Sequence, residues 1–120
     1  MSNVDVVKRC LDAITRQDTD TLHALSREDV EVHPLRAMLE DTVYRGREGV
    51  DQWMSDISES WAELRIETHE ISEPEPGHVI AQVTLYGRGH GSDAPTQMRV
   101  VLTAQVEDGL VTRAGVSTTG

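Results

Sequence analysis

The first half of the chain carries apolar residues at helical spacing, three or four positions apart on one face. This spacing predicts a helix over residues 3–16, a short second helix over 19–25 and a third over 47–63. The third helix follows a glycine-containing turn, and its apolar stripe consists of Val50, Trp53, Met54, Ile57, Trp61 and Leu64. One-sided helices of this kind indicate that all three cover a common core.

A short strand is predicted between the second and third helices. Val30 and Val32 alternate with polar residues over 30–33, and Pro34 ends the strand because proline lacks the backbone N–H that a sheet needs. Residues 35–43 are expected to form a loop or a helical turn.

The second half of the chain alternates with the period of two that is typical of strands. The alternation predicts strands over 65–71, 78–90, 97–107 and 110–116. A Pro- and Gly-rich turn separates the first two, and Asp108-Gly109 predicts a hairpin between the last two. Helices followed by an antiparallel meander indicate an α+β fold.

Alternation shows which side chains share a face of a strand, but not which face lies inward. In the 78–90 strand, Tyr86, Arg88 and His90 share one face, and the opposite face is plainly apolar. We therefore expect these three side chains to point outward or into an interface. The alternative is that they form a polar wall of a pocket.

Size and charge narrow the classes of partner. A chain of 120 residues suits one core, so we expect a single domain over 1–120. The net charge of −10 would repel polyanions, so nucleic acid and anionic membrane surfaces are not expected as partners. The chain has neither an apolar leader nor an apolar run long enough to span a membrane, which favours a cytoplasmic protein.

Six segments, in their order along the chain, resemble the SnoaL-like branch of the NTF2-like superfamily: Val7–Ile14, Gln17–Leu22, Asp29–His33, Tyr44–Val50, Gly89–Ser92 and Glu107–Val111. That superfamily includes ketosteroid isomerase, limonene-epoxide hydrolase, scytalone dehydratase and polyketide cyclases. The resemblance implies a cone in which three N-terminal helices pack on a strongly curved, mixed or antiparallel sheet. It says little about chemistry, because unrelated sites occur on one fold.

The resemblance also implies a homodimer that forms through the outer face of the sheet. The residues Gln97, Arg99, Val101, Thr103 and Gln105 share one face of the 97–107 strand and mix apolar with polar groups. Such a face suits a semi-polar interface. A solvated sheet face is the alternative.

His33 is the first candidate for a catalytic group. Aligned on ketosteroid isomerase, it falls where that enzyme has its catalytic Asp base, and imidazole is a suitable base near neutral pH. The alternative is a His that ends a strand or bonds a loop carbonyl. Tyr44 lies at the pocket mouth in the family pattern, so its hydroxyl is a candidate donor to a ligand; packing against the helix is its alternative.

The same comparison disfavours two known reactions. Where ketosteroid isomerase has its oxyanion-hole Tyr and its protonated Asp, this chain has Cys10 and about Leu102, which cannot stabilise a developing oxyanion. We read Cys10 as a small core residue. The acid–arginine–acid arrangement of limonene-epoxide hydrolase is not matched either, because the last strand has no acid.

The expected pocket is mostly apolar, with candidate wall residues Leu35, Met38, Leu39, Trp53, Met54, Trp61, Met98, Val100 and Leu102. Each of these could instead be plain core. No cofactor is indicated, and a single Cys with scattered His residues makes a metal site improbable.

Two classes of function remain open: a protein that binds a small hydrophobic molecule, and an enzyme of the cyclase, isomerase or dehydratase type in which His33 removes a proton next to a carbonyl. A dimerisation module with a collapsed pocket is a third possibility. The absence of a matched catalytic constellation favours binding.

Overall fold

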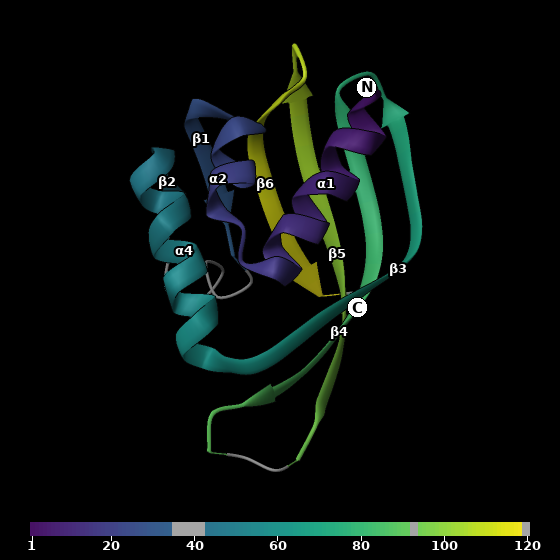
Figure 1. The fold of residues 1–120 in the computed structure, drawn as a ribbon. Helices are drawn as coiled ribbons and strands as arrows, with labels where there is room; N and C mark the ends of the chain where they lie inside the picture. The colour runs from purple at the N-terminus through teal and green to yellow at the C-terminus, as the bar shows by residue number, and fades with distance from the viewer. Residues whose placement is uncertain (35–42, 92–93, 119–120) are drawn as a thin grey trace.

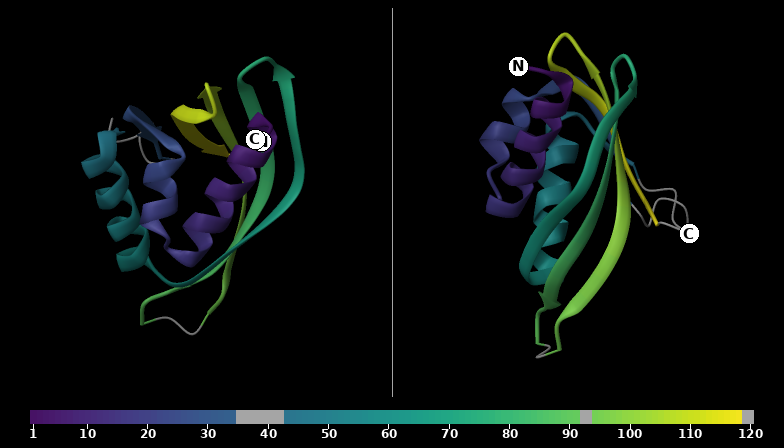
Figure 2. Two further views of the ribbon diagram at one scale, coloured as in Figure 1. Left: turned by 45° about the horizontal axis from the view of Figure 1, so that its top comes forward. Right: turned by 90° about the vertical axis from the view of Figure 1, so that its right-hand side faces the viewer.

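The computed structural model describes residues 1–34, 43–91 and 94–118. Helices α1 (Asn3–Arg16), α2 (Thr19–Ala24) and α4 (Gly46–Ser60) cover one face of a curved sheet, as Figure 1 and the side view in Figure 2 show. The strands are β1 (Ser26–His33), β2 (Tyr44–Arg45), β3 (Trp61–Glu75), β4 (His78–Gly89), β5 (Thr96–Glu107) and β6 (Leu110–Thr118). The predicted α+β architecture with three helices is confirmed.

The six strands form one mixed sheet in the order β2-β1-β6-β5-β4-β3. β1 and β6 run parallel, whereas all other neighbouring pairs are antiparallel. The first long strand therefore lies beside the last one, and the sheet ends at β2 and β3 without closing into a barrel. This order places β1, β6 and β5 together behind the helices.

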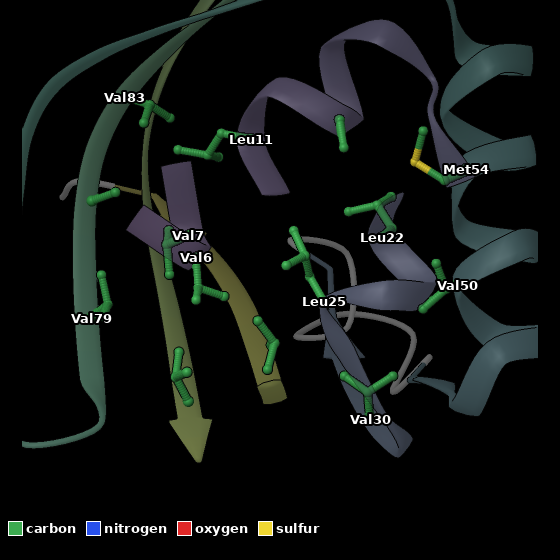
Figure 3. Close-up of a cluster of buried hydrophobic side chains, with 14 of the residues drawn as sticks. Val6, Val7, Leu11, Leu22, Leu25, Val30, Val50, Met54, Val79 and Val83 are labelled. Atoms are coloured by element: carbon green, nitrogen blue, oxygen red, sulfur yellow. The ribbon is translucent and has the colours of Figure 1, made fainter. Parts of the chain in front are cut away.

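The core lies between the helices and the inner face of the sheet. Its largest fully buried side chains are all valines from α1 and the strands, namely Val6, Val30, Val79, Val83 and Val100. Figure 3 shows side chains from α1, α2 and α4 pointing toward one another in this layer. Burying such side chains stabilises the fold by roughly 1.5–3 kcal/mol each.

Helix α1 begins where its sequence provides a cap. The Ser2 hydroxyl accepts a hydrogen bond from the Asp5 backbone N–H at 3.1 Å, and the Asp5 carboxylate accepts one from the Ser2 N–H, so the two form a capping box. The helix ends at Arg16, and the capping residue Gln17, with a left-handed backbone (φ 56°), donates its N–H to carbonyls of the last turn. These two caps fix the ends of α1.

The predicted end of the third helix is wrong. α4 ends at Ser60, and Trp61 and Leu64, which the helical stripe included, belong to β3. Leu64 pairs with Gly87 of β4, and the Trp61 ring lies so close to Gly87 that a Cβ there would come within 2.5 Å of it. This tertiary contact outweighs the helical periodicity of the sequence.

Other boundaries also differ from the sequence pattern. β3 runs over Trp61–Glu75 and so extends beyond the predicted 65–71 at both ends. β1 begins at Ser26 instead of Val30, because its polar start is held by backbone pairing to β6 and by Arg27, which bonds both Asp29 and Glu107. β2 is a two-residue strand that the pattern did not predict. Of the predicted loop or turn over 35–43, residues 35–42 lie outside the described part of the chain.

Among the described residues, no helix has the length and apolar character needed to cross a membrane.

Candidate functional site

A cavity of about 80 Å³ lies between the helices and the inner face of β1, β5 and β6. The helices line it with Val7, Cys10, Leu11, Ile14, Leu22, Val50 and Trp53. The strands line it with Ser26, Val30, Val32, Leu102, Thr103, Ala104, Val111, Ala114, Gly115 and Val116. In Figure 3, Leu11, Leu22 and Val50 point into this layer from three different helices.

Small side chains on the sheet account for this space. Ala104 of β5 lies directly opposite Ala114 of β6, so two methyl groups face the helices where longer side chains would fill the layer. Close packing is the rule in protein interiors, and a void of this size costs stability. The paired alanines therefore mark the place where the sequence departs from a filled core.

The wall of the cavity offers very little polar chemistry. Its polar side chains are the Ser26 hydroxyl and the Cys10 thiol, since alternation along β5 turns the Thr103 side chain to the outer face. Burial raises the pKa of the Cys10 thiol to about 11, so it is uncharged at neutral pH. A charged ligand group would lose its hydration here without gaining an ionic partner. The arrangement suits an uncharged, apolar molecule.

The nine predicted pocket residues divide into several groups. Trp53 and Leu102 line the cavity. Met54 and Val100 are buried in the core, and Met98 packs against that core. Leu35, Met38 and Leu39 lie outside the described residues.

Trp61 lines a different hollow. This depression has a volume of about 290 Å³ and lies where the ends of α1 and α4 meet the start of β3. Its lining residues are Ile14, Thr15, Gln17, Ile57, Trp61, Ala62, Glu63 and Leu64. Ile14 therefore borders both this depression, which we call the Trp61 depression, and the apolar cavity.

His33 lies on the other side of the sheet from the apolar cavity. Val30 and Val32 of β1 line the cavity, and by alternation His33 points to the outer face. There it borders an open hollow of about 540 Å³ together with His78, Gln105 and Arg113. The imidazole Nε2 is 3.1 Å from Glu31 Oε1, and Arg45 Nη1 is 3.2 Å from the other oxygen of that carboxylate.

Tyr44 is buried and bonded within the protein. Its hydroxyl donates a hydrogen bond to the Asp56 carboxylate on α4, which also accepts one from Gln52 Nε2 at 2.8 Å. Gly49 permits this approach, since a Cβ there would lie 2.7 Å from the Tyr44 carbonyl carbon. Tyr44 thus ties β2 to α4.

Tyr86, Arg88 and His90 do not converge on one point. The Arg65 guanidinium lies 4.6 Å from the centre of the Tyr86 ring, Arg88 pairs with Glu63 at 2.8 Å, and His90 Nε2 lies 2.8 Å from the Ser58 carbonyl oxygen. Each of the three is engaged with a neighbouring element instead of with the others.

Several cavity residues were not predicted as pocket residues, among them Ile14, Leu22, Val32, Ala114 and Val116. The sequence alone does not show that Ala104 and Ala114 face each other, because the register of β5 and β6 shifts between Gln105 and Val106. Across the parts of the chain that the structure describes, no cluster of three or more His, Cys, Asp or Glu side chains could hold a metal ion.

Comparison with protein families identifies the family of this chain. The family model described as a SnoaL-like domain matches residues 7–114. A search of curated proteins found no significant match.

Solved structures share the fold at low sequence identity. A Catenulispora acidiphila protein with a ketosteroid isomerase-like fold, in complex with trimethylamine, is 14% identical, with a TM-score of 0.85 over 98% of this chain and 88% of that one. A putative SnoaL-like polyketide cyclase from Jannaschia sp. CCS1 is 17% identical, with a TM-score of 0.81; the match covers 97% of this chain and 88% of that one. A Mycobacterium tuberculosis protein in complex with estradiol-17beta-hemisuccinate is 18% identical, with a TM-score of 0.79; the match covers 95% of this chain and 91% of that one. These likenesses confirm the predicted NTF2-like fold.

Proposed function

Because this chain belongs to the SnoaL-like domain family, we propose that it binds a small, uncharged, apolar molecule in the cavity between its helices and β1, β5 and β6. The observation that carries the proposal is the paired Ala104 and Ala114, which leave space in the middle of the core. Proteins keep a void at a cost in stability, and a ligand that fills it restores contacts that the void forfeits.

The chemistry of the wall supports this class of ligand. Leu, Val, Ile and Trp side chains make up most of the helical lining, and the single thiol is uncharged. Two structural relatives hold small organic molecules, trimethylamine in one and an estradiol hemisuccinate in the other. The fold therefore accommodates such molecules, although the identity to those relatives is too low to transfer their ligands.

Titration with a small apolar probe tests the proposal. The chain has two Trp residues, so two indole N–H signals can be followed by NMR and assigned with Trp→Phe variants. Trp53 lines the cavity and Trp61 does not. Xenon is expected to shift the Trp53 signal in a saturable manner and to leave the Trp61 signal unchanged.

A matched pair of variants provides the control. Ala114→Leu places three more carbons in the cavity and should abolish the xenon shift at Trp53. Ala24→Leu adds the same atoms at an exposed position of α2 outside the cavity lining and should leave the shift intact. A wild-type protein that shows no saturable shift, or an Ala114→Leu protein that keeps it, would contradict the proposed function.

A catalytic role of His33 is the second candidate, because an imidazole paired with a carboxylate is a common arrangement for a general base. Its substrate would occupy the outer hollow and not the apolar cavity. Candidate carbonyl compounds should then shift the His33 ring signals in wild-type protein. Unchanged signals across such a panel would end the hypothesis. Tyr44 could serve as a donor only by giving up its bond to Asp56.

We also propose that two copies associate through the outer face of the sheet. The β5 residues Gln97, Arg99, Thr103 and Gln105 are exposed on that face, and Ile80 of β4 keeps 36% of its surface exposed. A mixed face with an exposed large apolar side chain suits a semi-polar interface. A cytoplasmic location stays a prediction.

A further inference from the structure

Ile14 stands between two hollows of the molecule. Among the described residues, it is the one side chain that lines both the apolar cavity and the Trp61 depression. It lies in the last turns of α1 and is partly buried against the core. On the cavity side its neighbours include Leu11 and Trp53, and on the outer side they include Ile57 and Trp61.

The cavity is not fully enclosed, and the space that its side chains leave free is small. At about 80 Å³ it is roughly half the volume of the engineered apolar cavity, about 150 Å³, that takes benzene or xenon. A molecule larger than one ring would have to extend beyond the cavity wall. The Trp61 depression, at about 290 Å³, is an adjoining space that could receive the excess.

The lining of the Trp61 depression differs from that of the cavity. Ile57, Trp61 and Leu64 give it an apolar floor, but Gln17 and Glu63 bring polar groups to its rim. Glu63 is already paired with Arg88 at 2.8 Å. A long ligand could therefore keep an apolar end in the cavity and a longer or more polar end outside, past Ile14, which is common to both linings.

We propose that Ile14 sets the upper size limit of the ligand, and that the wild-type protein accepts uncharged apolar molecules no larger than a single six-membered ring. This inference rests on the proposed function, since it concerns the same cavity. The side chain acts as a steric partition, and no chemical step is assigned to it. Replacing it with a smaller residue should join the cavity to the Trp61 depression.

The experiment compares Ile14→Ala with Leu11→Ala, using benzene and n-butylbenzene as probes and the two indole N–H signals as readout. Leu11 lines the cavity but not the Trp61 depression, so its truncation adds volume to the cavity without joining the two spaces. Ile14→Ala should bind n-butylbenzene at least about tenfold more tightly than wild type, because several further methylene groups become buried. The bound butyl chain should then shift the Trp61 signal as well as that of Trp53.

Leu11→Ala should bind benzene more tightly than wild type and show no Trp61 shift with n-butylbenzene. Ile14→Val, a milder truncation that preserves the fold, should give a smaller change in the same direction as Ile14→Ala. The inference is overturned if wild type already binds n-butylbenzene as tightly as benzene, or if Leu11→Ala and Ile14→Ala behave alike. In either case xenon could still shift Trp53, so the proposed function would survive; a wild-type protein without any xenon response would instead defeat the proposed function.

Discussion

Cys10 illustrates how burial controls the chemistry of a single side chain. Burial raises the pKa of its thiol from 9.0 to about 11, so the reactive thiolate is scarce in the folded protein. At pH 9 about half of the thiols are ionised in the unfolded protein, but only about one in a hundred in the folded protein. We therefore expect iodoacetamide to alkylate Cys10 at least about fiftyfold more slowly in folded protein than in protein unfolded by guanidinium. Mass spectrometry of quenched samples measures both rates, and equal rates would contradict the burial of this thiol.

The same pKa difference predicts a pH dependence of stability. Between pH 9 and 11 the folded protein keeps the Cys10 proton, whereas the unfolded chain loses it, so the free energy of unfolding falls as pH rises through this window. The loss should be about 1 kcal/mol at pH 10. Cys10→Ser should lack this component, and urea unfolding of both proteins from pH 8 to 10.5 isolates it from the titration of other groups.

The hydroxyl of Tyr44 is the second residue whose contribution can be measured. Tyr44→Phe leaves the Asp56 carboxylate with one fewer donor and should lower the free energy of unfolding by about 1–2 kcal/mol. Tyr86→Phe is the matched control, because it retains the ring that Arg65 contacts, and should change stability by less than about 0.5 kcal/mol. Equal effects of the two variants in urea unfolding would argue against the bond to Asp56.

At the scale of elements, the junction of α4 and β3 depends on the contact between Trp61 and Gly87. A Cβ at Gly87 would lie 2.5 Å from the indole ring and 2.8 Å from the Glu63 backbone oxygen, so the strand or the ring must move. We expect Gly87→Ala to cost about 2 kcal/mol or more and to alter Trp61 fluorescence.

Gly89→Ala is a control on the same strand. Its added Cβ would meet the Ser60 backbone oxygen at 3.6 Å, an ordinary contact, so stability should stay within about 0.5 kcal/mol of wild type. A Gly87→Ala protein that unfolds at the wild-type urea concentration would show that the ring does not rest on Gly87.

The same elements show what a sequence pattern can and cannot predict. Helical spacing placed Leu11, Leu22 and Val50 on buried faces, and alternation placed Val79 and Val83 in the core, because burial on one side is the direct cause of both patterns. The helical pattern extends α4 beyond its true end at Ser60, because Trp61 fits the helical period as well as it fits a strand. Only the distant contact with Gly87 decides between helix and strand there.

At the scale of the whole molecule, the outer sheet face is the surface on which association is expected. The proposed homodimer should elute with twice the 13.3 kDa mass of the chain in size-exclusion chromatography with light scattering. Val101→Arg, on that face, should shift the mass to the monomer value by placing like charges opposite each other. Lys8→Glu, an exposed change on α1, should leave the dimer intact; a wild-type monomer at all concentrations would refute the proposal.

The candidate site was less accessible to sequence reasoning than the fold. Alternation shows which side chains of β5 share a face, but the free volume depends on which residues lie opposite each other on neighbouring strands. Pairing Ala104 with Ala114 requires the register of β5 and β6. The family alignment that points to His33 does not show which side of the sheet the residue faces. That side follows from the burial of Val32, its neighbour in β1.

A crystal structure of the protein pressurised with xenon would test the binding cavity most directly. We predict an anomalous xenon peak inside the layer between α1, α4 and β6, in van der Waals contact with Leu11, Trp53 and Ala114. Crystals that show no xenon there, with those side chains in mutual contact, would contradict the claim that this core encloses a binding cavity.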